Sequence, residues 1–302
     1  MKTAKYFIAL GIMLSASAAQ ADLLVYEGFE GYYKSGNNTT YNGLNDGGTK
    51  YIRLNHDANG GVGWKSKWTS KIPVMEKTMS KAGVKSSANG YWRGGDTSYR
   101  EIATGAGSNM AKAGMVKSNG KIGAVGKTLF ISFLWSFERK GGWGGFSLFN
   151  NTGNSKSRSE IAYFGKQGSN WGFSHNGLGD ASRTTNTGNR AFNIDNNNAS
   201  FQTNPDLIVM KLEFKSDKTE ITAWINPNTN KKLSDNGNIK TASDKALEFD
   251  GIRLASGGGH NNVDEIRMGT NYKSVLGVPE PATIALLAFG GVGLLRKRKK
   301  SA

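Results

Sequence analysis

The stretch LIVMKLEFKSDKTEITAWI, residues 207–225, decides the fold class. Apolar and polar side chains alternate with a period of two in both halves, which is typical of β-strands with one buried face. The halves Leu207–Lys215 and Glu220–Ile225 are separated by Ser216-Asp217-Lys218, which predicts a short hairpin connection. One face of this hairpin consists of Ile208, Met210, Leu212, Phe214, Ile221, Ala223 and Ile225.

Trp224 lies on the other face of the same hairpin. If the apolar set faces the core, Trp224 points outward, onto a sheet surface or into a groove, because successive side chains of a strand alternate between faces. The alternative is that both faces of this strand are covered and that Trp224 is packed.

Thr128–Glu138 is a second strong strand, predicted to be central, with Trp135 on its buried face. Glycine and asparagine clusters separate many further short strand-like segments, a pattern that predicts an all-β sandwich or jelly roll of two antiparallel sheets. These further segments are 23–29, 145–149, 160–164, 171–174, 247–254 and 263–268.

The two ends of the chain predict an exported protein. Met1–Lys5 is basic, Tyr6–Leu14 is apolar, and Ala19-Gln20-Ala21 is a small-x-small site, so a signal peptide of residues 1–21 is expected to be removed by signal peptidase between Ala21 and Asp22.

At the C-terminus, Pro279-Glu280-Pro281 precedes an apolar run, Ala282–Leu295, and a basic tail that begins Arg296-Lys297-Arg298. This arrangement resembles the PEP-CTERM sorting signal of Gram-negative bacteria. The resemblance implies a transient inner-membrane anchor, cleavage by an exosortase near Pro-Glu-Pro, and delivery to the cell surface, outer envelope or extracellular matrix. As a helix the run covers about 21 Å against a hydrocarbon core of about 30 Å. The alternative is an ordinary C-terminal membrane anchor, with the basic tail cytoplasmic in either case.

Removing both segments leaves one domain, residues 22–277, followed by the sorting signal at 278–302. Seven of the 39 basic residues and one of the 23 acidic residues lie in the removed segments, so the domain keeps a net charge of +10. A basic exported protein is attracted to anionic polysaccharide, lipopolysaccharide or phospholipid. Nucleic acid is not expected as a partner outside the cell.

The chain has no cysteine, which excludes disulfides, thiol catalysis and thiolate metal sites.

The domain also resembles concanavalin A-like (laminin G-like) jelly rolls. The residues that carry this resemblance follow one another in order over most of residues 23–268. They are Val25–Phe29, Gly61–Trp64 with Trp68, Ile131–Trp135, Ile208–Phe214, Trp224–Pro227 and Val263–Gly269. The resemblance implies that the first and last strands meet, and that oxygen donors such as Asp57, Asp195 and Asp264 are candidates to bind Ca²⁺.

Catalysis is not the favoured hypothesis. Glycoside hydrolysis needs two carboxylates on either side of the bond, and the Glu-x-Asp-x-x-Glu pattern of laminarinase-type enzymes is absent. Asp264 and Glu265 are adjacent in a strand, so they are expected to point to opposite faces. A lyase would need a Tyr or His base beside Arg and Gln, and no spacing joins the three histidines, His56, His175 and His260.

The sequence therefore favours a non-catalytic, glycan-binding or exopolysaccharide-associated surface protein. Tryptophan is the usual stacking platform for sugars, and the candidates are Trp64, Trp68, Trp92 and Trp224. A secreted carbohydrate-active enzyme and a purely structural envelope protein remain the alternatives. The side chains that line the surface groove distinguish them: aromatics and amides favour binding, and paired carboxylates favour hydrolysis.

Overall fold

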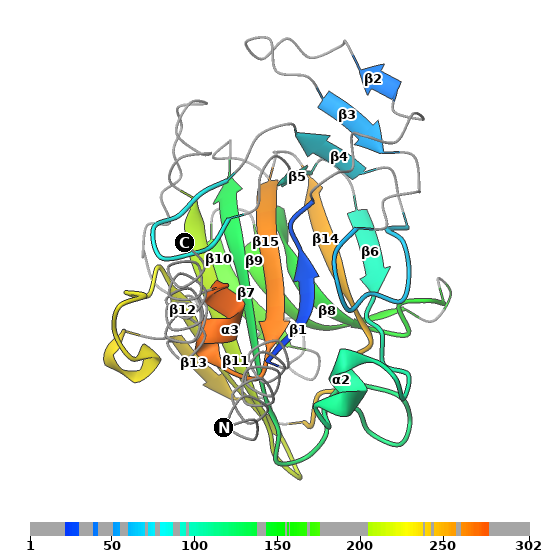
Figure 1. Ribbon diagram of the computed structural model, residues 1–302, viewed down its shortest axis with the longest axis vertical. Helices are drawn as coiled ribbons and strands as arrows, with labels where there is room; N and C mark the ends of the chain where they lie inside the picture. Colours follow the sequence, from blue (N-terminus) through cyan, green and yellow to red (C-terminus); the bar gives the residue numbers. More distant parts are fainter. Residues whose placement is uncertain are drawn as a thin grey trace, which may run out of the picture.

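A computed structural model describes residues 22–29, 39–41, 51–54, 60–69, 72–75, 79–86, 91–94, 97–137, 143–154, 156, 158–167, 170–175, 205–237, 239–242, 245–257 and 261–277. These residues form two antiparallel β-sheets, one of ten strands and one of five (Figure 1). The expected all-β sandwich of two antiparallel sheets is confirmed. Among these residues, no helix is long and apolar enough to cross a membrane.

The large sheet runs in the order β13-β12-β11-β7-β15-β5-β4-β3-β2, and β1 pairs with β15 beside β5. Its strands are β1 (Leu23–Glu27), β2 (Thr39–Tyr41), β3 (Tyr51–Leu54), β4 (Ile72–Met75), β5 (Tyr91–Arg93), β7 (Thr128–Phe137), β11 (Asp206–Phe214), β12 (Thr219–Ile225), β13 (Ile239–Ala242) and β15 (Asn261–Gly269).

The small sheet runs in the order β10-β9-β8-β14-β6. Its strands are β6 (Thr97–Glu101), β8 (Trp143–Asn150), β9 (Ser159–Gln167), β10 (Asn170–His175) and β14 (Gly251–Gly257). The helical elements are short: α2 (Asn109–Lys112), η2 (Leu233–Asp235) and α3 (Tyr272–Leu276).

The predicted hairpin is confirmed, since β11 pairs with β12 across Ser216–Lys218 and Ile208 lies opposite Ile225. The predicted segment 247–254 begins four residues too early, because only Phe249 makes an isolated bridge before β14 starts at Gly251. Short β2–β6 and β13 were not predicted, since three to five residues give little periodicity to detect.

The core lies between the two sheets. Phe133 of β7 stacks on Phe146 of β8 with ring centroids 4.9 Å apart, and Trp135 is fully buried beside Phe133. Ile221 and Ala223 of β12 point into this core, as their alternation predicts.

The chain closes on itself where β1 pairs with β15, which confirms that the first and last strands meet. Asp22, the expected first residue of the mature chain, fixes this closure. Its carbonyl accepts from Thr270 N, and its carboxylate accepts from Thr270 Oγ1 at 2.6 Å and Asn271 Nδ2 at 2.8 Å. Asn271 also caps α3, because its Oδ1 accepts from Ser274 N.

The outer face of the large sheet carries a second apolar cluster, covered by α3 and by the segment 79–86. Figure 1 shows α3 lying across this face over β7 and β15. Ser132 of β7 is buried there and donates to the carbonyl of Val275. This cluster consists of Met79, Leu134, Leu207, Val209, Trp224 and Leu276, with Val84, Leu233 and Tyr272 packed against it.

A buried ion pair ties the two sheets together. Glu27 of β1 pairs with Arg100 of β6, and both side chains are almost fully buried. Arg100 also donates to the carbonyls of Gly60 and Ser66, and its guanidinium lies 4.7 Å from the centre of the Trp64 ring. The pair thus fixes the segment 60–69 against both sheets.

We expect Arg100→Met to destabilise the protein by about 3–5 kcal/mol, because Glu27 is then left buried without its partner. Adding Glu27→Gln should recover part of this loss, since the unpaired charge is removed. Urea unfolding followed by tryptophan fluorescence measures both variants. The control is Lys65→Met, which breaks the exposed Lys65–Glu101 pair and should cost less than about 1 kcal/mol. Equal losses for Arg100→Met and Lys65→Met would contradict this account.

Candidate functional site

A pocket of about 690 Å³ lies on the outer face of the large sheet. Its floor comes from three neighbouring strands: Phe130 of β7, Lys211 of β11 and Trp224 of β12. These residues share a face because Lys211 lies opposite Phe130, and Val209 on the same side of β11 lies opposite Trp224. The floor is therefore set by strand alternation and register.

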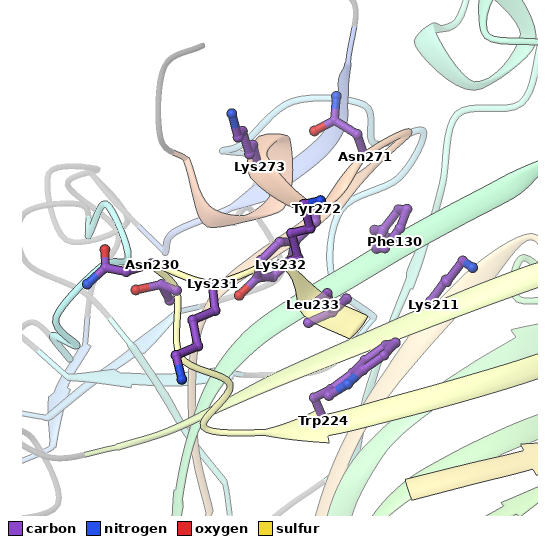
Figure 2. Close-up of a pocket in the computed structure, with 11 residues that line it drawn as sticks. Phe130, Lys211, Trp224, Asn230, Lys231, Lys232, Leu233, Asn271, Tyr272 and Lys273 are labelled. Carbon is purple, nitrogen blue, oxygen red and sulfur yellow. The ribbon is translucent and has the colours of Figure 1, made fainter. Parts of the chain in front are cut away.

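One wall is the connection between β12 and β13, and the other is the start of α3 (Figure 2). The connection is held by its own asparagines: Asn228 N donates to Asn236 Oδ1, and Asn230 N donates to Asn228 Oδ1. The α3 wall is held by the Asn271 cap and by Asp22. The walls contribute Thr229, Asn230, Lys231, Lys232 and Leu233 on one side and Asn271, Tyr272 and Lys273 on the other.

The pocket is strongly basic. Lys231, Lys232 and Lys273 are exposed around it, and no Asp or Glu is found among the described residues that line it. Lys211 is partly neutralised, because its Nζ lies 3.0 Å from a carboxylate oxygen of Glu213 next to the pocket. The arrangement favours an anion.

Two buried donors at the pocket have no hydrogen-bond partner among the residues that the structure describes. They are Nε1 of Trp224, whose side chain is 4% exposed, and the hydroxyl of Tyr272. Burial raises the pKa of Tyr272 to about 12, so the hydroxyl keeps its proton at neutral pH. An unsatisfied buried donor costs about 1–3 kcal/mol.

The pocket therefore combines apolar ring surface, a cationic rim and two buried donors without partners among the described residues. This is the chemistry of a site that binds a ligand with oxygen atoms and negative charge. The described residues that line it include no histidine and no carboxylate, so they offer no carboxylate pair for glycoside hydrolysis.

Of the four predicted tryptophans, only Trp224 lines this pocket. It points away from the core as the alternation predicts, and it is also covered, so both interpretations offered for it hold in part. Trp64 is half-buried, and its Nε1 donates to the carbonyl of Tyr26.

The prediction of an exposed binding platform is corrected for Trp68 and Trp92. Both are fully buried in the core between the sheets, where no sugar could stack on them. Trp68 Nε1 donates to Glu27, and the Trp92 ring lies so close to Gly94 that a Cβ there would clash. Composition could not distinguish these two from Trp224.

Of the predicted calcium ligands, Asp57 and Asp195 lie outside the described residues. Asp264 is fully buried, and its oxygens accept from the backbone N–H groups of Glu265 and Met79. Burial, together with the charge of Glu265, raises the pKa of Asp264 well above its usual range, which disfavours the ionised form that a cation needs. Among the described residues, no group of three His, Cys, Asp or Glu is placed to hold a metal.

The expectation that Asp264 and Glu265 point to opposite faces is also corrected. A β-bulge between Asp264 and Arg267 disrupts the alternation, and Glu265 has a φ of 55°. Asp264 lies opposite Leu134 of the outer cluster, while Glu265 pairs with Arg267 on that same outer face. Both acids are buried under α3 and the segment 79–86, away from the pocket lining.

Sequence reasoning missed most of the pocket. Alternation alone places Lys211 beside Trp224, so this pair could have been found. The other lining residues come from a connection (Lys231, Lys232) and from the short helix α3 (Tyr272, Lys273). The positions of both depend on which strands pair, and no local pattern shows that. The predicted sorting-signal residues and the predicted signal-peptide cleavage site lie outside the described residues. They are Pro279, Glu280, Pro281, Arg296, Lys297 and Arg298, and Ala19 and Ala21.

We expect Tyr272→Phe to stabilise the ligand-free protein by about 1 kcal/mol, because it removes a buried hydroxyl that has no partner. The matched control is Tyr163→Phe. The Tyr163 hydroxyl donates to the carbonyl of Gly144 at 2.8 Å, so its loss should destabilise the protein by a similar amount. Thermal unfolding of both variants measures whether each substitution raises or lowers the stability of the protein. Loss of stability in both would mean that the Tyr272 hydroxyl is already satisfied.

Comparisons with known proteins give little for the domain. No curated protein matches the chain. Solved structures with low-level similarity include the following three. The SPRY domain of human HERC1 has 10% identity and a TM-score of 0.27, covering 62% of this chain and 92% of its own. A protein described as a beta-glucanase from Mycobacterium abscessus has 11% identity and a TM-score of 0.27, covering 66% and 76%. Lectin I-B4 from Griffonia simplicifolia, in its metal-free form, has 9% identity and a TM-score of 0.29, covering 82% and 92%. Likenesses this weak carry no inference about ligand or activity.

The C-terminus gives a definite result. Residues 277–299 match the family model described as the PEP-CTERM protein-sorting motif. The match begins at Gly277, the left-handed residue that ends α3 and the last residue that the structure describes. The chain therefore carries a PEP-CTERM protein-sorting motif directly after the helix that forms one wall of the pocket.

Proposed function

We propose that this chain is an exported, non-catalytic surface or matrix protein that binds acidic polysaccharide through the pocket on its large sheet. The sorting motif implies export that depends on an exosortase, with a transient membrane anchor. The glycan ligand, the association with exopolysaccharide and the Gram-negative inner membrane belong to the proposal.

The observation that carries this proposal is the pairing of buried, unsatisfied donors with a rim of positive charge. Trp224 and Tyr272 offer buried N–H and O–H groups without partners, while Lys231, Lys232 and Lys273 surround them. A uronate residue carries a carboxylate for the lysines, hydroxyl oxygens for the donors and a C–H face for an aromatic ring. A neutral sugar would use only the last two.

The size of the pocket supports the same ligand class. A volume of about 690 Å³ lies within the range of about 300–1,000 Å³ that is usual for sites binding small ligands, so a few sugar units would fit. The glycosidase alternative has less support, because no carboxylate pair is found among the described residues that line this pocket.

We expect Lys231→Gln/Lys232→Gln to weaken binding of alginate, a uronate polymer, by about tenfold, since two favourable charge contacts are lost. Isothermal titration with alginate and with neutral dextran measures the effect. The matched control is Lys112→Gln/Lys127→Gln, which removes the same charge from exposed positions in and after α2. Equal weakening of alginate binding by both double variants would mean that the net charge of the protein, and not this pocket, accounts for the binding.

Tyr272→Phe provides a second, uncharged test. It should weaken alginate binding about tenfold at both low and high salt, because a hydrogen bond inside a pocket is little affected by screening. A purely structural role for Tyr272 would change stability and leave alginate affinity intact, and that result would contradict the proposed site.

A further inference from the structure

The basic pocket lies next to the point where the chain leaves the domain for its membrane anchor. Asn271, Tyr272 and Lys273 line the pocket, and α3 ends only a few residues later at Gly277. Five residues of helix rise about 8 Å, so the exit point and the pocket wall are neighbours.

The exit point is firmly held on the body. The carbonyl of Leu276 accepts from Lys85 N at 2.9 Å, and Gly277 N donates to the carbonyl of Ser274. Arg267, which pairs with Glu265, also donates to the carbonyl of Lys85. A Cβ at Gly277 would press on Lys85 and Arg267 in a backbone conformation with φ of +69°. The last turn of α3 therefore cannot swing away from the large sheet without breaking several contacts.

The connection from this point to the apolar run is short. Ala282, where the run starts, lies five residues after Gly277, so the two are separated by at most about 18 Å even in extended chain. Electrostatic attraction to a charged surface acts over about 8 Å at physiological salt. When the domain is held this close to a bilayer, the lysines on the face nearest the bilayer lie within the range of this attraction.

We propose that, while the sorting motif is uncleaved, the pocket face docks on anionic phospholipid headgroups through Lys231, Lys232 and Lys273. The three side chains are exposed, and no carboxylate among the described lining residues competes for Lys231 or Lys232. Each lysine near an anionic bilayer adds to the attraction. Docking occupies the pocket, and removal of the motif uncovers it.

This inference goes beyond the proposed polysaccharide ligand. It needs the transient anchor that the sorting motif implies and the charge of the pocket rim, and it holds whether or not alginate binds. Two measurements therefore separate the two proposals. Alginate titration tests the ligand, and lipid dependence of pocket exposure tests the docking.

The absence of cysteine makes a direct experiment available. The full chain with Asn230→Cys, on the pocket rim, is labelled with a fluorophore and reconstituted in nanodiscs of phosphatidylcholine, with or without phosphatidylglycerol. A second reporter, Ser118→Cys, lies in an exposed turn next to Asn119, whose side chain donates to Glu248 ahead of the small sheet's β14. Acrylamide, a neutral quencher, measures the exposure of each reporter.

We expect phosphatidylglycerol to reduce quenching at position 230 by about twofold and to leave position 118 unchanged. Lys231→Gln/Lys232→Gln should abolish the effect at position 230, and Lys112→Gln/Lys127→Gln should retain it. Equal quenching at position 230 in both lipids would overturn the inference. So would equal protection of both reporters, because it would mean non-specific adsorption of a basic protein.

Discussion

The antiparallel pairing of β1 with β15 is the contact on which the rest of the domain depends. It joins Asp22 to Thr270, 248 positions apart in the chain, and places Asn271 where its side chain both holds Asp22 and caps α3. Because α3 is one wall of the pocket, the start of the mature domain and the candidate site are linked through one asparagine. Such a distant pairing closes a very long loop, so it is expected to be among the later steps of folding.

A second long-range contact complements this closure. The Glu27–Arg100 pair connects β1 with the small sheet, so the first strand is fixed on two sides: to β15 within its own sheet and to β6 across the core. The buried acids at the bulge in β15 add a third contact, since Arg267 links Glu265 to the backbone of Lys85. The three contacts hold the β1–β15–α3 region as one unit beneath the exit of the sorting motif.

The sequence predicted the elements with local periodicity and missed those placed by topology. The hairpin 207–225, the central strand from Thr128 and the outward direction of Trp224 all follow from alternation, and the structure confirms them. Alternation does not say which face is later covered, so Trp68 and Trp92 could not be separated from a surface tryptophan. It also fails at a bulge, which is why Asp264 and Glu265 share a face. Lys231, Lys232 and Lys273 line one pocket only because β12 and β15 belong to one sheet, with β11 and β7 between them, and this strand order has no local signal.

A crystal structure of the protein with a short uronate oligosaccharide would show whether this pocket is the binding site. We expect a sugar in the pocket on the large sheet, with oxygen atoms within hydrogen-bond distance of Tyr272 Oη or Trp224 Nε1 and a carboxylate near Lys231 or Lys232. Sugar bound on the small sheet, with this pocket empty at saturating oligosaccharide, would contradict it.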